Sequence, residues 1–111
     1  MADEVRFQNS NHKDWHVFSI IGRIDVTTTS ASVEEAGNAV LTTADKIALD
    51  MSATDYISSA GLRTLLRLSK KAKRAKKVLV IFGARGMIKD VFAVAGMDML
   101  VTIYNSKEDL P

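Results

Sequence analysis

The sequence predicts an α/β domain in which helices pack on a mixed central β-sheet, and three observations support this class. Strand-like and helix-like hydrophobic patterns alternate along the chain after an N-terminal pair of strands. An uninterrupted apolar run from Val78 to Phe82 suits a strand buried inside a sheet rather than one at its edge. The 111 residues, 47% of them hydrophobic, suffice for one core. We therefore expect residues 1–111 to form a single domain.

The N-terminal segment predicts a β-hairpin. Val5 to Gln8 is a short strand-like run, and residues 9–14 are rich in turn-forming side chains. Trp15 to Ile21 mixes apolar and small residues up to Gly22, which is typical of a strand covered on more than one side.

A helix is expected next. Residues 27–30 all carry hydroxyl side chains, which are favoured at the N-terminus of a helix and disfavoured in its interior. This helix should therefore begin near Ser30 or Ser32. Glu34 and Glu35 would then lie in the first turn, where the helix dipole favours acids. The apolar face has helical spacing and comprises Val33, Ala36, Val40 and Leu41.

The centre of the chain predicts a strand over Lys46–Met51, a loop over Ser52–Ile57, and then the clearest helix of the sequence. This helix has two faces of the same period. Its apolar face comprises Leu62, Leu65, Leu66, Ser69 and Ala72, and its cationic face comprises Arg63, Arg67, Lys70, Lys71 and Arg74.

The C-terminal part predicts a third helix over Met87–Ala95, capped by Gly96, and a last strand over Leu100–Tyr104. The apolar face of this helix comprises Ile88, Val91, Phe92 and Ala95. Ser106 and Asp109 then have the spacing of a capping box, so another helix should begin there.

Composition and motifs exclude several classes of function. Cysteine is absent, which rules out disulfides and thiolate metal ligands, and His12 and His16 fall in a turn and a strand, so we expect neither a metal nor a cofactor. No glycine-rich phosphate loop or recognisable catalytic set occurs, and Asp50 and Asp55 lack partners for acid–base work, so we expect no enzyme. The acidic start and the lack of an apolar run of about 20 residues predict a cytoplasmic protein without a membrane span.

Cations are concentrated in residues 70–77, although the formal net charge is only +2. This block invites a nucleic-acid hypothesis. The block lies at the C-terminal end of a predicted helix, however, where the negative end of the helix dipole favours cations. It also has no interleaved aromatic side chains on which bases could stack. We interpret it as a solvated helix end and expect no direct contact with nucleic acid.

Two adjacent hydroxyls, Ser58 and Ser59, stand where the predicted central loop gives way to the second helix. Spacing alone favours a structural role, with one serine as the N-cap. The start of a helix also stabilises an anion by roughly 0.3–1 kcal/mol, so a phosphate on either serine would be tolerated. Gly61 follows, and it serves either close packing or the approach of a partner to the hydroxyl.

An aliphatic strand, a short loop and the run Tyr56-Ile57-Ser58-Ser59-Ala60-Gly61-Leu62 resemble the phosphorylation-site motif of STAS domains, most closely the bacterial anti-sigma factor antagonists. Gly22-Arg23-Ile24-Asp25 is similar to the glycine-to-aspartate turn that follows the second strand in that family, and Ala95-Gly96-Met97 with Leu100 fits its C-terminal half. The resemblance implies a STAS fold with a C-terminal helix longer than this chain provides.

The resemblance also implies a site. Ser59 matches the phosphoacceptor, and Ser58 stands where many antagonists have aspartate, which makes it the alternative acceptor. Asp25 alone would be a turn acid that accepts a backbone N–H bond, and the resemblance adds a place on the partner-binding surface. That expected surface comprises Asp25, Ser58, Ser59, Gly61 and Leu62.

The expected function is therefore that of an anti-sigma factor antagonist. Unmodified protein would bind an anti-sigma factor that is also a serine kinase, phosphorylation on Ser59 would release it, and a PP2C-type phosphatase would restore the free serine. The alternative is a STAS scaffold or accessory subunit that is never phosphorylated and makes constitutive protein contacts.

Overall fold

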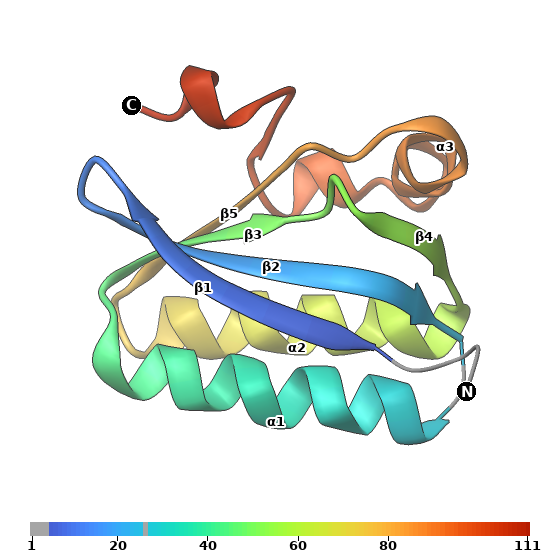
Figure 1. Ribbon diagram of the computed structural model, residues 1–111, viewed down its shortest axis with the longest axis horizontal. Helices are drawn as coiled ribbons and strands as arrows, with labels where there is room; N and C mark the ends of the chain where they lie inside the picture. The colour runs from blue at the N-terminus through green and yellow to red at the C-terminus, as the bar shows by residue number, and fades with distance from the viewer. Residues whose placement is uncertain (1–4, 26) are drawn as a thin grey trace.

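The computed structural model describes residues 5–25 and 27–111, so most of the acidic start on which the cytoplasmic prediction rests lies outside the described residues. A six-stranded sheet has the order β1-β2-β3-β5-β6, and β4 pairs with the end of β2 (Figure 1). The strands are β1 (Arg6–His12), β2 (Trp15–Ile24), β3 (Lys46–Asp50), β4 (Thr54–Ile57), β5 (Val78–Phe82) and β6 (Ile103–Tyr104). The helices are α1 (Thr27–Thr43), α2 (Ser59–Arg74) and α3 (Gly86–Ala95), with short 3₁₀ turns at Met97–Met99 and Lys107–Asp109.

The sheet is mixed, as predicted. β1 pairs with β2 in antiparallel fashion, while the β2–β3, β2–β4, β3–β5 and β5–β6 pairs are all parallel. β5 lies between β3 and β6, which confirms that the apolar run of Val78–Phe82 is an inner strand.

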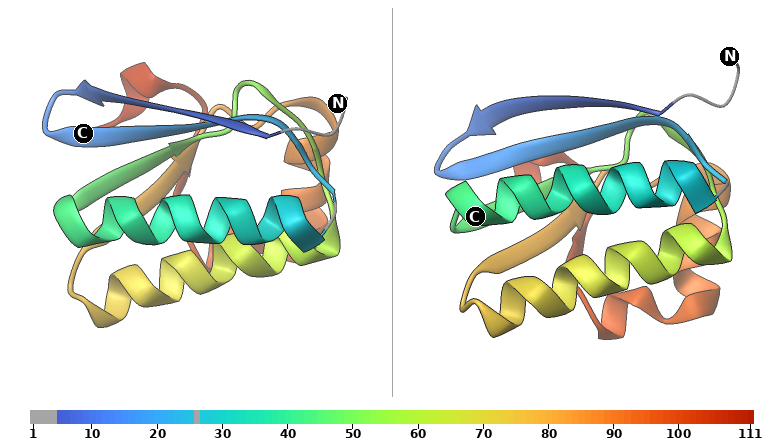
Figure 2. Two further views of the ribbon diagram at one scale, coloured as in Figure 1. Left: turned by 60° about the horizontal axis from the view of Figure 1, so that its bottom comes forward. Right: turned by 90° about the horizontal axis from the view of Figure 1, so that it is seen from below.

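The two faces of the sheet have separate cores. Helices α1 and α2 lie side by side across one face, as both views of Figure 2 show, and bury the larger core there. Its members include Phe18, Ile24, Leu49, Leu65 and Leu68. The other face is covered by the C-terminal segment, where Leu110 packs with Trp15 and Phe82. The Trp15 indole donates a hydrogen bond of 3.0 Å to the carbonyl of Pro111.

The predicted hairpin is present, but its first strand is longer than expected. β1 continues through Asn9, Ser10 and Asn11, whose partners on β2 are Phe18, Val17 and His16. The prediction of a turn over residues 9–14 was therefore wrong, and only Lys13 and Asp14 form the turn. Pairing with β2 outweighs the turn preference of these side chains, because at the edge of the sheet their polar groups remain exposed.

β2 also runs past its predicted end. Gly22 adopts φ +110°, and the register with β4 shifts between Gly22 and Arg23. This bulge lets one strand pair first with β3 and then with β4. The expected glycine-to-aspartate turn is thus a bulged strand as far as Ile24, and the expected loop over Ser52–Ile57 contains strand β4.

Helix α1 begins at Thr27, one turn earlier than the predicted start near Ser30 or Ser32. Glu34 and Glu35 therefore lie beyond its first turn, contrary to the prediction. The predicted apolar face is confirmed, because Val33 and Val40 are buried and Ala36 and Leu41 pack against the core. Gly37 allows close approach to α2, since a Cβ there would lie 2.7 Å from Leu68 Cδ1.

The C-terminal predictions are largely confirmed. α3 ends at Gly96 with φ +69°, and Ser106 and Asp109 form a capping box. The helix that this box opens is a 3₁₀ turn of three residues, and the last strand comprises only Ile103 and Tyr104. No helix in the described parts of the chain has the length and apolar character needed to cross a membrane.

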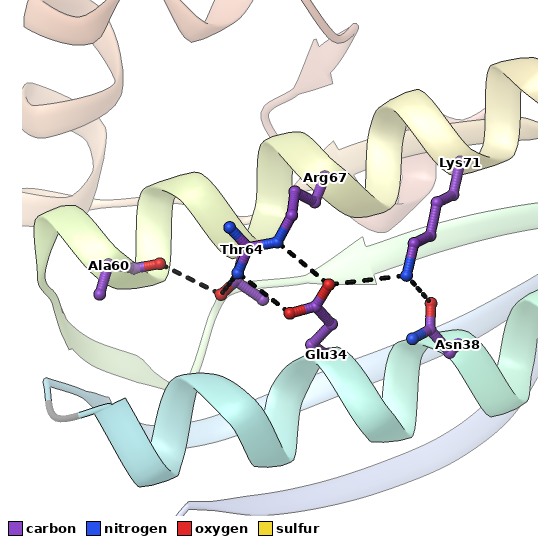
Figure 3. A network of polar contacts seen from close by, with 6 residues as sticks. All are labelled: Glu34, Asn38, Ala60, Thr64, Arg67 and Lys71. Atoms are coloured by element: carbon purple, nitrogen blue, oxygen red, sulfur yellow. Dashed lines mark hydrogen bonds and ion pairs between the residues drawn. The ribbon is translucent and has the colours of Figure 1, made fainter.

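A polar network joins α1 to α2 along their exposed sides (Figure 3). The Arg67 guanidinium donates two hydrogen bonds of 3.0 Å to the Glu34 carboxylate, and the Lys71 ammonium lies 3.5 Å from the same carboxylate and 3.1 Å from Asn38 Oδ1. Arg67 also donates to the buried Thr64 hydroxyl at 3.2 Å. The hydrogen bonds from Arg67 lower the pKa of Glu34 below its usual range.

We expect Glu34→Gln to lower the midpoint of urea unfolding slightly at pH 7. A carboxyl whose pKa is lowered by folding stabilises the protein above its unfolded value near 4.5, and this stabilisation disappears as the pH falls through the lower folded value. The difference between the variant and the wild type should therefore shrink as the pH falls below 4.5 and through the lower pKa of the folded state. Glu35→Gln is the matched control, because Glu35 is exposed and forms no ion pair with a described residue. Equal stability of Glu34→Gln and the wild type at pH 7 would contradict the prediction.

Candidate functional site

The candidate site lies where two parallel strands end side by side. Ile24 at the end of β2 pairs with Ile57 at the end of β4, and the Ser58 N–H donates a hydrogen bond of 2.8 Å to the Ile24 carbonyl. The chain therefore leaves the sheet at Asp25 on one strand and at Ser58 on the other. Helices α1 and α2 both begin at this end of the molecule (Figure 1).

Ser58 is the N-cap of α2. Its backbone is extended, with φ −89° and ψ 173°, and its Oγ accepts a hydrogen bond of 3.2 Å from the Gly61 N–H. Its carbonyl accepts the first helical bond, 2.9 Å long, from the Leu62 N–H. The structural role expected for one of the two serines thus belongs to Ser58.

Ser59 is the first residue of α2, and its side chain is exposed. Within residues 5–25 and 27–111, its hydroxyl forms no hydrogen bond with another residue. The N–H groups of Ser59 and Ala60 open the helix without intrahelical acceptors, so the positive end of the dipole surrounds this hydroxyl. The two serines therefore differ, because the Ser58 hydroxyl caps the helix and the Ser59 hydroxyl has no partner among the described residues.

Gly61 is explained by packing. It is buried, and a Cβ at this position would lie 2.7 Å from Ile57 Cγ1, 2.9 Å from Ile24 Cγ2 and 3.1 Å from the Ile24 carbonyl oxygen. The missing side chain thus faces the ends of β2 and β4 rather than the solvent. Of its two proposed roles, the structure supports close packing of α2 on the sheet.

Asp25 and two residues that sequence reasoning missed form a polar cluster beside the serines. Arg23 Nε lies 3.0 Å from Asp25 Oδ2, and the Arg23 guanidinium stacks 4.5 Å from the centre of the Tyr56 ring. Asp25 Oδ1 is buried and has no hydrogen-bond partner among the described residues, so the expected backbone N–H bond is not seen there. Arg23 and Tyr56 both stand in the motifs, but only the β2–β4 register shows that they pair.

Leu62, the last of the expected site residues, is half-buried one turn beyond Ser59. It packs against the core and lines a shallow hollow of about 300 Å³ between α2 and α3. The structure thus brings the five expected residues together at one end of the sheet, with Asp25, Ser58, Ser59 and Leu62 reaching the surface and Gly61 beneath it.

The other candidate groups lie elsewhere. His16 Nε2 is 2.8 Å from Asn9 Oδ1, and no three acidic or histidine side chains of the described residues are placed to hold a metal ion. The cationic block closes α2 as predicted, but Lys71 joins the Glu34 network and the Lys77 ammonium donates to the Leu41 carbonyl. These two cations therefore anchor α1 to the end of α2 rather than being only solvated.

The family model of the STAS domain matches residues 6–110. The chain belongs to the STAS domain family. Its relatives include RsfB of Mycobacterium tuberculosis, an anti-sigma-F factor antagonist, which is 28% identical over 108 residues that cover 96% of this chain and 87% of the relative. BtrV of Bordetella bronchiseptica, assigned as a candidate anti-sigma factor antagonist, is 33% identical over 63 residues, which are 57% of this chain and 54% of that protein.

Solved structures share the fold. An anti-sigma factor antagonist from Mycobacterium paratuberculosis superposes with a TM-score of 0.86 at 24% identity, over 98% of this chain and 92% of that one. The Bacillus cell fate determinant SpoIIAA in its phosphorylated form superposes with a TM-score of 0.68 at 12% identity, over 93% of this chain and 95% of that one.

Proposed function

We propose that this domain is an anti-sigma factor antagonist whose binding is controlled by phosphorylation of Ser59. Unmodified protein binds an anti-sigma factor that is also a serine kinase, the phosphorylated form releases it, and a PP2C-type phosphatase restores the hydroxyl. The observation that carries the proposal is the different use of the two serines, since Ser58 caps α2 and the exposed Ser59 hydroxyl has no partner among the described residues.

The start of α2 suits a phosphate on Ser59. The modification adds about −1.5 to −2 charges at neutral pH, and unpaired N–H groups with the positive end of the dipole favour such a charge. Phosphorylation of Ser58 would instead place the group on the oxygen that accepts the Gly61 N–H bond. Modification of Ser59 thus preserves the cap.

The activity in this proposal belongs to the partners. The domain serves as a substrate and a binding surface in the cytoplasm, with no cofactor and no direct contact with nucleic acid. Its 111 residues act as one unit. The antagonist assignment of RsfB and the phosphorylated form of SpoIIAA support this role by family and by fold.

The proposal predicts where a kinase places the phosphate. After incubation with an anti-sigma factor kinase from the same organism, phosphopeptide mass spectrometry should find the modification on Ser59. Ser59→Ala should abolish labelling. Ser58→Ala is the matched control, and it should remain a substrate although the lost cap lowers the free energy of unfolding by about 1 kcal/mol. Phosphate on Ser58 would refute the assignment, and failure of every such kinase to label the protein would favour the constitutive scaffold.

A further inference from the structure

The first half of β5 has one unpaired edge. β6 has only two residues, and they pair with Ile81 and Phe82 near the end of β5. The Ile81 N–H donates a bond of 3.0 Å to the Thr102 carbonyl, whereas the Val78 N–H donates to the opposite side, toward β3. Leu79 faces the β6 side like Ile81, since alternate residues bond to one neighbour, but its N–H and carbonyl have no hydrogen-bond partner among the described residues. Such an edge is a template for another extended chain.

A hollow of about 370 Å³ lies along this edge. β5 contributes Val78, Leu79 and Val80 to its lining, the end of α2 contributes Lys73, and residues 98–102 form the opposite wall. The C-terminal end of α2 lies next to the start of β5 (Figure 2). Val78 is 48% exposed although it begins an inner strand. The hollow thus combines free backbone groups with an exposed apolar side chain.

The two faces of β5 determine which side chains an added strand would need. Leu79 packs against the core beneath α1 and α2, on the same face of the sheet as Lys73, whereas Val80 packs in the core of the other face. Val78 shares the face of Val80, because side chains alternate along a strand. The residues of an added strand would therefore lie in turn beside the cation of Lys73 and beside the apolar side chain of Val78.

The charges around the hollow indicate an acidic occupant. Four exposed cations near the end of α2 form no ion pair with a described residue: Lys70, Lys73, Arg74 and Lys76. The acid of the lining is Asp98, on the opposite wall. A second copy of this chain would bring the same cations against these, whereas an acidic segment would be attracted. The lining has no aromatic side chain on which a nucleic-acid base could stack.

We propose that the Leu79 edge of β5 binds an extended segment of a partner protein in which acidic and apolar side chains alternate. The segment adds a strand to the sheet, so its backbone pairs with the Leu79 N–H and carbonyl while its acids face Lys73. This surface is separate from the serine pair. Ser59 begins α2 and Lys73 lies fourteen residues later, a separation of about 21 Å at some 1.5 Å per residue, so one protein can occupy each end of the helix.

The probe for this edge is a short peptide of alternating glutamate and valine with blocked ends. It is titrated into the ¹⁵N-labelled full chain, and amide hydrogen exchange is followed by NMR. In the free protein, the Leu79 amide should exchange at least roughly tenfold faster than that of Ile81, which is bonded to Thr102. Saturation with the peptide should slow exchange at Leu79 to near the rate of Ile81. A Leu79 amide that the peptide leaves unprotected would overturn the proposal.

A second peptide separates strand pairing from charge attraction. It has the same side chains, but alternate backbone nitrogens are methylated, so the edge that faces β5 cannot donate hydrogen bonds. We expect this peptide to bind about tenfold more weakly, the effect of losing one or two hydrogen bonds. Equal affinity of the two peptides would overturn the proposal.

Matched variants test the place of the acids. Lys73→Glu should weaken binding of the first peptide about fivefold, because an attractive surface pair becomes repulsive. Arg63→Glu is the control, since it makes the same change of charge at an exposed position of α2 that does not line the hollow. Binding by this variant should stay within about twofold of the wild type. An equal loss in both variants would show a nonspecific effect of net charge and would contradict the proposed site.

Two further measurements address other occupants. Sedimentation of the wild type at the concentration of the titration should show a monomer. A dimer that the peptide dissociates would instead assign the edge to a second copy of this chain. A single-stranded oligonucleotide should not displace the peptide, and displacement would assign the hollow to nucleic acid. Either of these contrary results would overturn the assignment to an acidic protein segment.

Discussion

Ser59→Asp should fold normally and lose about a thousandfold in affinity for the cognate anti-sigma factor kinase, while Ser59→Ala should bind constitutively. A charge left unpaired inside an interface costs several kcal/mol, and about 4 kcal/mol corresponds to that factor. The fold should accept the change, because the side chain is exposed and an acid at the start of a helix is favoured by the dipole. Calorimetric titration of the wild type and both variants measures the effect.

The control for this result is stability. Urea unfolding should show that Ser59→Asp is at least as stable as Ser59→Ala, so weaker binding cannot be ascribed to unfolding. No conformational change is required, since the start of α2 can hold the anion while the partner rejects it. Equal affinity of all three forms would remove the switch from the proposed function.

Gly61→Ala should lower the free energy of unfolding by about 1–3 kcal/mol, although alanine is the better helix former by roughly 1 kcal/mol. The new methyl group would approach the Ile24 carbonyl oxygen to 3.1 Å as well as the Ile57 and Ile24 side chains, and the backbone of a paired strand cannot easily move. Urea unfolding followed by circular dichroism measures the loss.

Gly37→Ala is the matched control for Gly61→Ala. A Cβ at position 37 comes as close to a neighbour, but the neighbour is the end of the Leu68 side chain, at 2.7 Å from Cδ1. Leu68 can rotate, so this substitution should cost less than Gly61→Ala. If Gly61→Ala were as stable as the wild type, the packing explanation for this glycine would be wrong.

The predictable parts of the fold are those that local patterns determine. Three elements can be predicted from local sequence alone. The apolar face of α1 follows from helical spacing, the end of α3 follows from a glycine that can adopt positive φ, and the inner strand β5 follows from an uninterrupted apolar run. The predicted apolar face of α2 is incomplete, because it omits Leu68, which is buried in the structure. Leu68 follows Leu65 by three residues and precedes Ala72 by four, so helical spacing already places it on this face, and in the structure it packs against α1 at Gly37.

The parts that could not be predicted depend on pairing across the sheet. β4 has only four residues and carries the exposed Asp55, so its sequence predicts a loop. In the structure it is a strand because the bulge at Gly22 brings it into register with β2. The same pairing creates the Arg23–Tyr56 contact beside the site. By contrast, the serine pair was recognisable from the motif, and the structure adds the assignment of the cap to Ser58.

The packing of Leu110 on the second face of the sheet provides an optical probe. Trp15 is the only tryptophan of the chain, and it is buried against Leu110 while its indole donates to Pro111. It begins β2, whereas the serine pair adjoins the other end of that strand, about 30 Å away at some 3.3 Å per residue. Intrinsic fluorescence of this indole therefore reports the docking of the last residues on the sheet, and a phosphate or partner at Ser59 should leave its emission unchanged.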